Sequence, residues 1–465
     1  MTDPAAPSDP AFAAPGAEPD APDGLAARRA AFALLTAVLD RRQAFDEAAD
    51  RLDALARMPD VRDRGFARAM ALTVLRRLGQ LDHLIDRYLE RAPKGRGKAV
   101  RHVLRLGAAQ IVFLGAPPHA AVDTSVALAE AEGLAPFKGL VNAILRKIAR
   151  EGGAVCRKQD AARLNTPAWL RESWVAAYGE AAARAIGEAH LAEPPLDLSV
   201  RNAAEAAAWA ERLGGAALEG ATVRLAPPGD VRRLPGFEEG AWWVQDAAAA
   251  LPARLLIRAL ARASGGDAGL DGRRVIDLCA APGGKTAQLA AAGARVTAVD
   301  RSGPRLARLR ENLGRLQLDA EVVEADAERW RPAAPADAVL LDAPCTATGT
   351  LRRHPDIAHL KGPADVARLA ALQRRLIAAA AAMLSPGGVM VYATCSLQPE
   401  EGEEAVEEAL DADPGLAMLP VEAAGLGGFA EAISPRGWMR TLPYHRAEAG
   451  GCDGFFAAVL HKKPG

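Results

Sequence analysis

The sequence predicts domains of two classes, an all-α domain followed by an α/β domain with a mostly parallel sheet. Its 465 residues are too many for a single hydrophobic core. Apolar residues of segment 25–150 recur at helical spacing, without strand-like alternation. Beyond residue 271, short apolar runs alternate with helical segments, and repeated strand–helix–strand units form parallel sheets with helices on both faces.

The first 150 residues divide into two parts. Residues 1–24 are rich in Pro, Ala and Asp and almost lack large apolar side chains, so we expect a disordered tail. Residues 25–150 are expected to form the helical domain. Its apolar stripes are Leu34, Leu35, Val38 and Leu39; Met70, Val74, Leu75 and Leu78; Val100, Val103, Leu104 and Leu106; and Val141, Ile144, Leu145 and Ile148.

Residues 151–245 have a mixed pattern and are expected to form a small α/β linking domain. A helical stretch, Trp169–His190, precedes an extended segment, Leu196–Asn202. Trp242–Asp246 then leads into a further helix, and we place the last domain boundary near residue 245.

Segment 246–465 is expected to form the α/β domain. Its first strand, Val275–Leu278, is followed by a Gly-rich turn and a helix, Thr286–Ala292. The other expected elements are strands at Val296–Val299, Glu321–Val323, Ala338–Leu341, Val389–Tyr392 and Phe455–Leu460, and helices at Arg305–Leu316 and Val366–Leu384.

The cysteine content indicates a reducing compartment. Five cysteines, an odd number without close pairing, argue against a disulfide framework, and the lack of CxxC argues against structural zinc. Apolar runs are too short for a membrane span, and the N-terminus does not resemble a secretory signal. We therefore expect a cytoplasmic protein that binds neither a membrane nor a metal.

Charge is unevenly distributed, although the formal net charge is only −1. Residues 25–150 contain 22 Lys and Arg against 13 Asp and Glu, a net charge of +9. A basic module of this kind suits a polyanion such as RNA, and a solvated helical surface would have the same composition. The densest basic cluster is Lys94, Arg96, Lys98, Arg101 and Arg105.

Two cysteine-bearing segments, Asp342–Cys345 and Ala393–Ser396, each follow a strand-like run. In an open parallel sheet both would emerge at the carboxyl edge, where such folds bind ligands. Two buried structural cysteines are the alternative, because that is the usual fate of a lone Cys. Cys345 and Cys395, placed alike beside the Asp342 carboxylate, favour covalent chemistry on an electrophilic substrate.

The Gly-rich turn Asp277–Thr286 lacks both the P-loop pattern and the GxGxxG fingerprint, so neither phosphate-binding interpretation holds. Asp300 ends the second strand, where a carboxylate ordinarily accepts hydrogen bonds from ribose hydroxyls. Asp326 follows the third strand and suits an adenine contact. These features favour a nucleoside cofactor without phosphates, such as S-adenosylmethionine, although strand-end aspartates also cap helices.

Five motifs of this region form a recognisable series. They are Cys279–Lys285 (CAAPGGK), Asp342–Gly349 (DAPCTATG), Arg352–Ile357 (RRHPDI), Thr394–Ser396 (TCS) and Gly454–Phe456 (GFF). Together they resemble the Sun/Nop family of RNA 5-methylcytosine methyltransferases. Val141–Arg146 (VNAILR) resembles the end of a NusB-like RNA-binding domain. Two residues depart from the family pattern: Thr346 stands where Ser is commoner, and Ala347 where many members have Gly.

The resemblance implies a Rossmann-like methyltransferase domain behind a NusB-like domain. The implied reaction moves a methyl group from S-adenosylmethionine to carbon 5 of a cytidine, in small-subunit (16S) ribosomal RNA. Cys395 matches the nucleophile that adds to carbon 6, because carbon 5 alone is too weakly nucleophilic. Asp342 would hydrogen-bond or protonate ring nitrogen 3, and Cys345 would assist product release.

The resemblance also implies a cofactor pocket. It would be lined by Cys279, Ala280, Ala281, Pro282, Gly283, Gly284, Lys285, Asp300, Asp326 and Asp342. Lys285 would contact the base or the cofactor, and Cys279 would be a packing residue of the turn. Cys156 and Cys452 belong to no motif, and His354 is expected to position its loop or contact RNA.

Three other functions compete with this interpretation. A non-catalytic RNA-binding or ribosome-assembly factor would not need the two cysteines and the cofactor acids, all of which are present. A methyltransferase acting on exocyclic amino groups needs no nucleophilic thiol. Within the family, a transfer RNA cytosine is the nearest alternative, and the NusB-like domain and RRHPDI favour ribosomal RNA. We expect the enzyme to act as a monomer.

Overall fold

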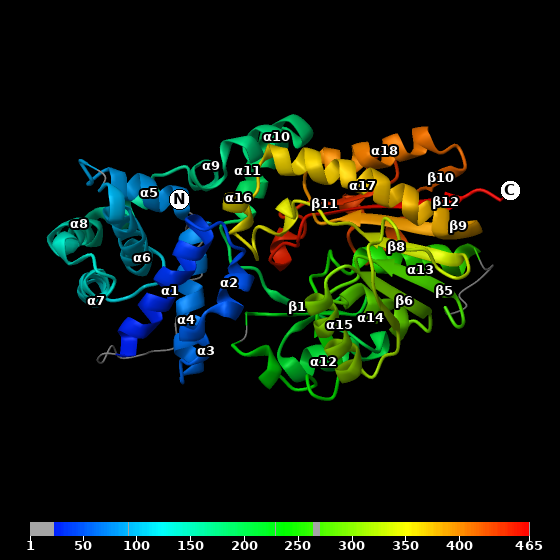
Figure 1. Ribbon diagram of the computed structural model, residues 1–465, viewed down its shortest axis with the longest axis horizontal. Coiled ribbons are helices and arrows are strands. Elements are labelled where there is room, and N and C mark those ends of the chain that lie inside the picture. The colour runs from blue at the N-terminus through cyan, green and yellow to red at the C-terminus, as the bar shows by residue number, and fades with distance from the viewer. Residues whose placement is uncertain (1–22, 92, 228, 264–269, 465) are drawn as a thin grey trace, which may run out of the picture. The chain divides into compact units, whose positions relative to one another are not determined.

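The computed structural model describes residues 23–91, 93–227, 229–263 and 270–464. The chain divides into two compact units (Figure 1). The helical unit comprises the residues up to Pro167 together with His354–Leu360. The sheet unit comprises Ala168–Arg353 and Lys361–Gly465. The expected disordered tail falls mostly outside the described residues, and its last two residues, Asp23 and Gly24, begin the first helix.

The helical prediction for residues 25–150 is confirmed. Residues of the predicted stripes, such as Leu35, Val74, Leu104 and Leu145, are fully buried in one common core. The last long helix runs past residue 150, so the expected boundary falls within it. The helices are α1 (Asp23–Leu39), α2 (Phe45–Arg51), α3 (Asp53–Ala56), α4 (Val61–Arg76), α5 (Leu78–Asp86), α6 (Val100–Val112), α7 (Pro118–Ala131), α8 (Lys138–Arg157), α9 (Ala161–Asn165) and α16 (Ile357–Leu360).

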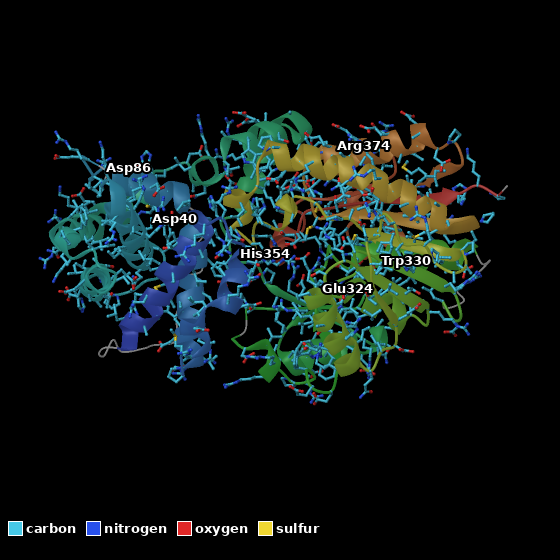
Figure 2. All side chains as sticks on the ribbon, in the orientation of Figure 1. Asp40, Asp86, Glu324, Trp330, His354 and Arg374 are labelled. Carbon is cyan, nitrogen blue, oxygen red and sulfur yellow. The ribbon has the colours of Figure 1, made fainter. Side chains whose placement is uncertain are left out.

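The short segment His354–Leu360 joins the helical unit through specific polar contacts. The Asp356 carboxylate accepts a hydrogen bond from the backbone N–H of Phe45, at 3.0 Å. A ring nitrogen of His359 lies 3.0 Å from the carbonyl oxygen of Leu75. His354, labelled in Figure 2, pairs with Asp46, and this hydrogen bond holds the pKa of Asp46 below its usual range. The part of the RRHPDI motif from His354 onward therefore has a structural role in this unit, and the contact of His354 is of the kind that a loop-positioning residue makes.

A small antiparallel sheet forms the first part of the sheet unit, with the strand order β2-β3-β1-β4. The expected extended segment at Leu196–Asn202 is β1, and the expected helical stretch before it is a pair of helices. The elements are α10 (Ala168–Tyr178), α11 (Glu180–Ala189), β1 (Leu196–Val200), α12 (Ala206–Leu213), β2 (Ala216–Leu218), β3 (Thr222–Leu225) and β4 (Trp242–Val244).

The large sheet has the order β10-β12-β9-β8-β5-β6-β7, and β11 pairs with β12. The five strands from β9 to β7 are parallel, whereas β12 runs antiparallel to β9. This confirms the predicted mostly parallel sheet. Its strands are β5 (Arg274–Leu278), β6 (Arg295–Asp300), β7 (Glu321–Glu324), β8 (Ala336–Asp342), β9 (Leu384–Thr394), β10 (Leu416–Leu419), β11 (Met439–Thr441) and β12 (Phe455–Lys462).

Helices cover both faces of this sheet, as Figure 1 shows. On one face, α17 and α18 pack on buried residues such as Leu341 and Met390. On the other, α13 and α14 pack on residues such as Val275 and Val391. The strand order reverses beside β5, because β6 and β7 lie on one side of it and β8 and β9 on the other. Open α/β sheets bind ligands at such a point. The helices are α13 (Leu251–Ala263), α14 (Gly284–Ala291), α15 (Gly303–Leu316), α17 (Pro363–Met383) and α18 (Glu403–Ala412).

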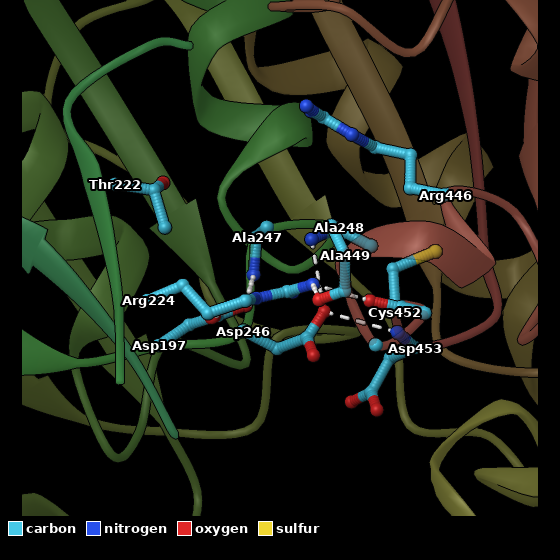
Figure 3. A network of polar contacts seen from close by, with 12 residues as sticks. Asp197, Thr222, Arg224, Asp246, Ala247, Ala248, Arg446, Ala449, Cys452 and Asp453 are labelled. Carbon is cyan, nitrogen blue, oxygen red and sulfur yellow. Dashed lines mark hydrogen bonds and ion pairs between the residues drawn. The ribbon is translucent and has the colours of Figure 1, made fainter. Parts of the chain in front are cut away.

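A buried network of ion pairs connects the small sheet to the large one (Figure 3). Arg224 of β3 donates two hydrogen bonds of 2.7 Å to the Asp197 carboxylate of β1. The same guanidinium donates to the carbonyl oxygens of Ala449 and Gly451, which precede β12. Both charged side chains are almost fully buried.

Two further arginines, Arg352 and Arg353, extend the network at the end of the loop that follows β8. Arg352 pairs with Asp246 and with Asp453, each at 3.3 Å, and Arg353 also pairs with Asp453. Burial would raise the pKa of Asp246, but Arg353 and Arg352 hold it below its usual value. With Arg224 and Asp197, three cations face three anions, so the buried charge is balanced.

Replacing Arg224 by Met is expected to destabilise the sheet unit by about 3–5 kcal/mol, because the buried Asp197 carboxylate would lose its counter-ion. Urea unfolding of the full chain measures the change. Arg232→Met is the matched control, since Arg232 pairs with Asp230 on the surface and should change stability little. Equal effects of the two substitutions would contradict this account.

Candidate active site

The two motif cysteines meet at the carboxyl ends of β8 and β9. These strands are parallel neighbours, and Asp342 is in register with Ala393. The loops that follow therefore start side by side, and the sulfur atoms of Cys345 and Cys395 lie 3.4 Å apart. Both side chains are partly exposed. The sequence predicted the common edge, and the structure adds direct contact between the thiols.

Main-chain contacts fix the two loops against each other. The N–H of Gly349 donates to the carbonyl oxygen of Cys395 at 2.9 Å, and the N–H of Gly454 donates to that of Gly349 at 2.8 Å. A side chain on Gly349 would place its Cβ only 2.0 Å from the carbonyl oxygen of Gly454. Glycine is therefore required there, and the DAPCTATG and GFF motifs pack directly on one another.

The surroundings of the Cys345 thiol make it a weaker acid than an ordinary cysteine. The hydrogen bond with Cys395 and burial raise the pKa of Cys345 well above its ordinary value. A thiol in this state keeps its proton at neutral pH. Either sulfur can be the donor in the contact between Cys345 and Cys395.

Asp342, the last residue of β8, accepts a hydrogen bond of 2.7 Å from the ammonium group of Lys285. Lys285 is buried, whereas the Asp342 carboxylate is about one third exposed. The ammonium also lies 5.1 Å from the centre of the Phe455 ring, a cation–π contact. This carboxylate–ammonium pair links the cofactor turn to the strand that leads to Cys345.

The CAAPGGK turn joins β5 to α14 with a tightly bent backbone. Gly283 has a φ of 103° and precedes the first helical residue, Gly284. Cys279 is left-handed, with a φ of 61°, a conformation that costs a residue with a side chain roughly 1–2 kcal/mol. Burial raises the pKa of the Cys279 thiol to about 12. Cys279 is thus a packing residue, as expected.

Asp300 and Asp326 have different surroundings. Asp300, at the end of β6, is buried and accepts hydrogen bonds from the N–H groups of Ala281 and Ser302. It therefore borders the cofactor turn. Asp326 is exposed and accepts a hydrogen bond from the N–H of Glu328. That contact closes a turn between β7 and β8, so Asp326 does not cap a helix there.

Asp277 is a candidate functional residue that the sequence interpretation did not select. It is the penultimate residue of β5, is fully buried and accepts a hydrogen bond of 2.6 Å from the hydroxyl of Thr286. Its second carboxylate oxygen has no partner among the described residues. Burial raises its pKa to about 7. The sequence held a signal for this residue, because Asp277 is a charged residue inside the otherwise apolar predicted strand Val275–Leu278, two residues before Cys279.

A pocket of about 310 Å³ lies along the cofactor turn, between Trp243 and the Asp342 strand end. Asp277 and the turn residues from Ala280 to Lys285 line it. The partnerless Asp277 oxygen and the close-packed turn suit a ligand with a hydrogen-bond donor. The residues present therefore fit a nucleoside cofactor bearing an ammonium group.

Sequence comparison assigns both units to known families. Residues 268–461 match the family described as 16S rRNA methyltransferase RsmB/F, and residues 25–150 match the NusB family. The ribosomal RNA small subunit methyltransferase B of Pseudomonas putida is 38% identical over 94% of this chain and 98% of its own length. That of Sodalis glossinidius is 37% identical over 79% of this chain and 89% of its own.

The chain belongs to the RsmB/F family of 16S rRNA methyltransferases. It is an S-adenosylmethionine-dependent RNA methyltransferase, and the family resemblance drawn from the motifs is confirmed.

Solved structures support the fold of this RsmB/F member. The crystal structure of PH0851 superposes with a TM-score of 0.71 at 22% identity, covering 94% of this chain and 99% of that chain. The structure of NSun6 from Pyrococcus horikoshii with SFG has a TM-score of 0.51 at 21% identity, covering 64% and 98%.

Within the described ranges, the RsmB/F chain has no helix long and apolar enough to cross a membrane. The same residues contain no cluster of three or more His, Cys, Asp or Glu side chains arranged to hold a metal ion. Cys156 and Cys452 are buried, and burial raises the pKa of each thiol.

Asp277→Asn is expected to remove a pH dependence of stability. In the unfolded chain this carboxyl ionises near pH 4, whereas the folded protein keeps it protonated up to about pH 7. Stability is therefore lost as pH rises through this window, by about 4 kcal/mol in total. Urea unfolding near pH 4 and near pH 8 measures the difference between wild type and variant, with exposed Asp411→Asn as the control. Parallel pH profiles of Asp277→Asn and wild type would contradict the assignment.

Proposed function

We propose that this protein methylates carbon 5 of a cytidine in 16S rRNA through a covalent adduct with Cys395. The observation that carries this proposal is the contact between two thiols, 3.4 Å apart, at the strand end that also presents Asp342. With Cys345 as the donor and Cys395 as the acceptor, the pair would provide a nucleophile and a separate proton-transfer group. A methyltransferase that acts on exocyclic amino groups needs neither.

Cys395 starts the reaction by adding to carbon 6, which makes carbon 5 nucleophilic. The hydrogen bond from Cys345 stabilises the Cys395 thiolate before the attack. Asp342 faces ring nitrogen 3, where negative charge develops as the C–S bond forms, and it delivers a proton or a hydrogen bond there. Lys285, 2.7 Å from Asp342, holds that side chain in place. A proton given to ring nitrogen 3 returns to Asp342 when the bond between carbon 6 and sulfur breaks.

Cys345 completes the reaction by accepting the proton from carbon 5. In the adduct the sulfur of Cys395 is a neutral thioether, so the interaction that raised the pKa of Cys345 is lost. Cys345, which is partly exposed, then releases its own proton to water and becomes a base. After it takes the carbon 5 proton, the bond between carbon 6 and sulfur breaks, and the electron pair returns to Cys395.

S-Adenosylmethionine, when bound, supplies the electrophilic methyl group. We propose that it is held by the turn from Cys279 to Lys285 and by Asp300, Asp326 and Asp342. Asp300 already accepts hydrogen bonds from the main chain of this turn, so it orders the turn as well as offering an acceptor at the strand end. Asp326 contributes an exposed acceptor at the next strand end.

The helical unit is proposed to bind the RNA through phosphates. Two residues of the expected basic cluster are already neutralised, because Arg101 pairs with Asp86 and Arg105 with Asp82 (Asp86 is labelled in Figure 2). The remaining members, Lys94, Arg96 and Lys98, are exposed. Of the basic cluster, these three side chains therefore form the proposed RNA-binding surface.

We further propose that the enzyme is a cytoplasmic monomer. All five cysteines are free thiols, which suits a reducing compartment. The full set of reacting groups named above comes from one chain, so catalysis does not need a second copy.

Replacing Lys94, Arg96 and Lys98 together by Gln should flatten the salt dependence of RNA binding. Each lost phosphate contact removes roughly 0.9 from the slope of log affinity against log salt, so the triple variant should lose up to about 3. Filter binding of a 16S rRNA fragment over a salt series measures this. Arg51→Gln and Arg57→Gln, at exposed residues already paired with Glu47 and Asp53, are the controls. An unchanged slope would mean that RNA binds elsewhere.

Substitutions of the two cysteines are expected to block different steps of the reaction. Cys395→Ala should abolish both methylation and covalent complexes, because it lacks the attacking sulfur. Cys345→Ala should methylate once and then retain the RNA covalently on Cys395, because the carbon 5 proton is not removed. Denaturing gels with labelled rRNA fragments and cofactor distinguish these outcomes by a slow-migrating band, with Cys156→Ala as the control thiol. A band in Cys395→Ala alone would reverse the roles, and an active double variant would exclude the covalent mechanism.

A further inference from the structure

Glu401 is a fully buried carboxylate beneath the two cysteine loops. It follows β9 by a few residues, at the end of the short helical turn Pro399–Glu401. Its own carbonyl oxygen accepts hydrogen bonds from the side chains of Tyr392 and Thr394 in β9, at 2.7 and 3.2 Å. The main chain of Glu401 is therefore held by the strand that leads to Cys395.

The Glu401 side chain contacts the residues next to both cysteines. It accepts hydrogen bonds from the N–H and hydroxyl of Thr346, which follows Cys345. It also accepts one of 2.6 Å from the hydroxyl of Ser396, which follows Cys395. A fourth donor is the Gln373 amide at 3.2 Å, which also donates to the carbonyl oxygen of Pro344.

The Glu401 side chain makes more hydrogen bonds than would be needed only to fill the space between the two loops. Thr346, Ser396 and Gln373 have no exposed surface, so water does not compete for their hydrogen bonds. A carboxylate has no proton to donate and has two oxygens, so it can accept from both loops at once. An apolar residue of similar size would fill the space but would leave the backbone N–H of Thr346 without a partner.

We propose that Glu401 is a positioning residue that sets the contact between Cys345 and Cys395 by binding the residue after each of them. The inference rests on the proposed roles of the two cysteines and extends them. It assigns the carboxylate a second effect, because its negative charge lies close to Cys345. The hydrogen bond with Cys395 and burial raise the pKa of Cys345, and the charge of Glu401 adds to them, so Glu401 favours the protonated Cys345 thiol.

Two substitutions of Glu401 distinguish its effect on the position of the cysteines from the effect of its charge. Glu401→Ala removes all four hydrogen bonds, and it should lower kcat by roughly 10²-fold, the effect of a small misplacement of reacting groups. The KM for RNA and cofactor should stay near wild type. Glu401→Gln keeps an acceptor for Thr346 and Gln373, and its amide can donate to the two hydroxyls. It should recover most of the lost kcat.

Thiol alkylation provides a measurement independent of activity. The modification of Cys345 by iodoacetamide, followed by mass spectrometry over a pH series, reports the protonation of that thiol. Removing the neighbouring charge should move the Cys345 profile of Glu401→Gln to lower pH than wild type. Glu404→Ala, at an exposed glutamate of α18, is the matched control for both measurements.

The outcomes distinguish a failure of the role proposed for Glu401 from a failure of the covalent mechanism on which that role rests. Wild-type kcat in a folded Glu401→Ala variant, or an unshifted Cys345 profile in Glu401→Gln, would overturn the inference. If Glu401→Ala does not fold by circular dichroism, the Glu401→Gln profile decides alone. A fully active Cys395→Ala enzyme would instead overturn the proposed mechanism, whatever the glutamate variants show.

Discussion

The compensation of buried charge is the constraint on which the position of the active site depends. Removing a charge from water costs several kcal/mol, which only close pairing can offset. The sheet unit buries Arg224 and Arg352, which pair with aspartates, and Arg353, about one third exposed, pairs with the buried Asp453. Their partners come from β1, from the segment before α13, and from the segment before β12. The network therefore requires distant parts of the chain to meet where the loop after β8 ends.

The catalytic loops have little freedom within this frame. The loop after β8 starts at a strand in register with β9 and ends at Arg352 and Arg353, so both ends are fixed. Between them, Gly349 contacts the main chain of Cys395 and Gly454. Two identical side chains, Cys345 and Cys395, are thereby brought into contact. The roles proposed for them depend on the surroundings that the fold imposes.

Much of the sheet unit could be predicted because buried parallel strands are short apolar runs and functional loops follow them. The same logic placed Cys345, Cys395 and Asp300 at one sheet edge. Ala347 was noted only as a departure from a commoner glycine. The structure supplies the reason for the glycine preference, since this residue has a left-handed φ of 59°.

What escaped prediction depends on contacts between residues far apart in sequence. Glu401 lies in an acidic stretch, Glu400–Glu404, that resembles the exposed first turn of a helix, and its burial depends on Thr346 and Gln373. The pairing of Arg101 with Asp86 likewise depends on how α5 and α6 pack. Charge counting treats such residues as free, because composition carries no information about partners.

The discontinuous helical unit has a consequence for the biosynthesis of the protein. Its helices up to Pro167 leave the ribosome first, whereas the segment that completes it, His354–Leu360, is translated only after most of the sheet unit. Until then the backbone N–H of Phe45 lacks the Asp356 carboxylate, and the carbonyl oxygen of Leu75 lacks His359. The helical unit is synthesised first, but it lacks these two contacts until the segment His354–Leu360 has been translated. Its co-translational folding is therefore completed late.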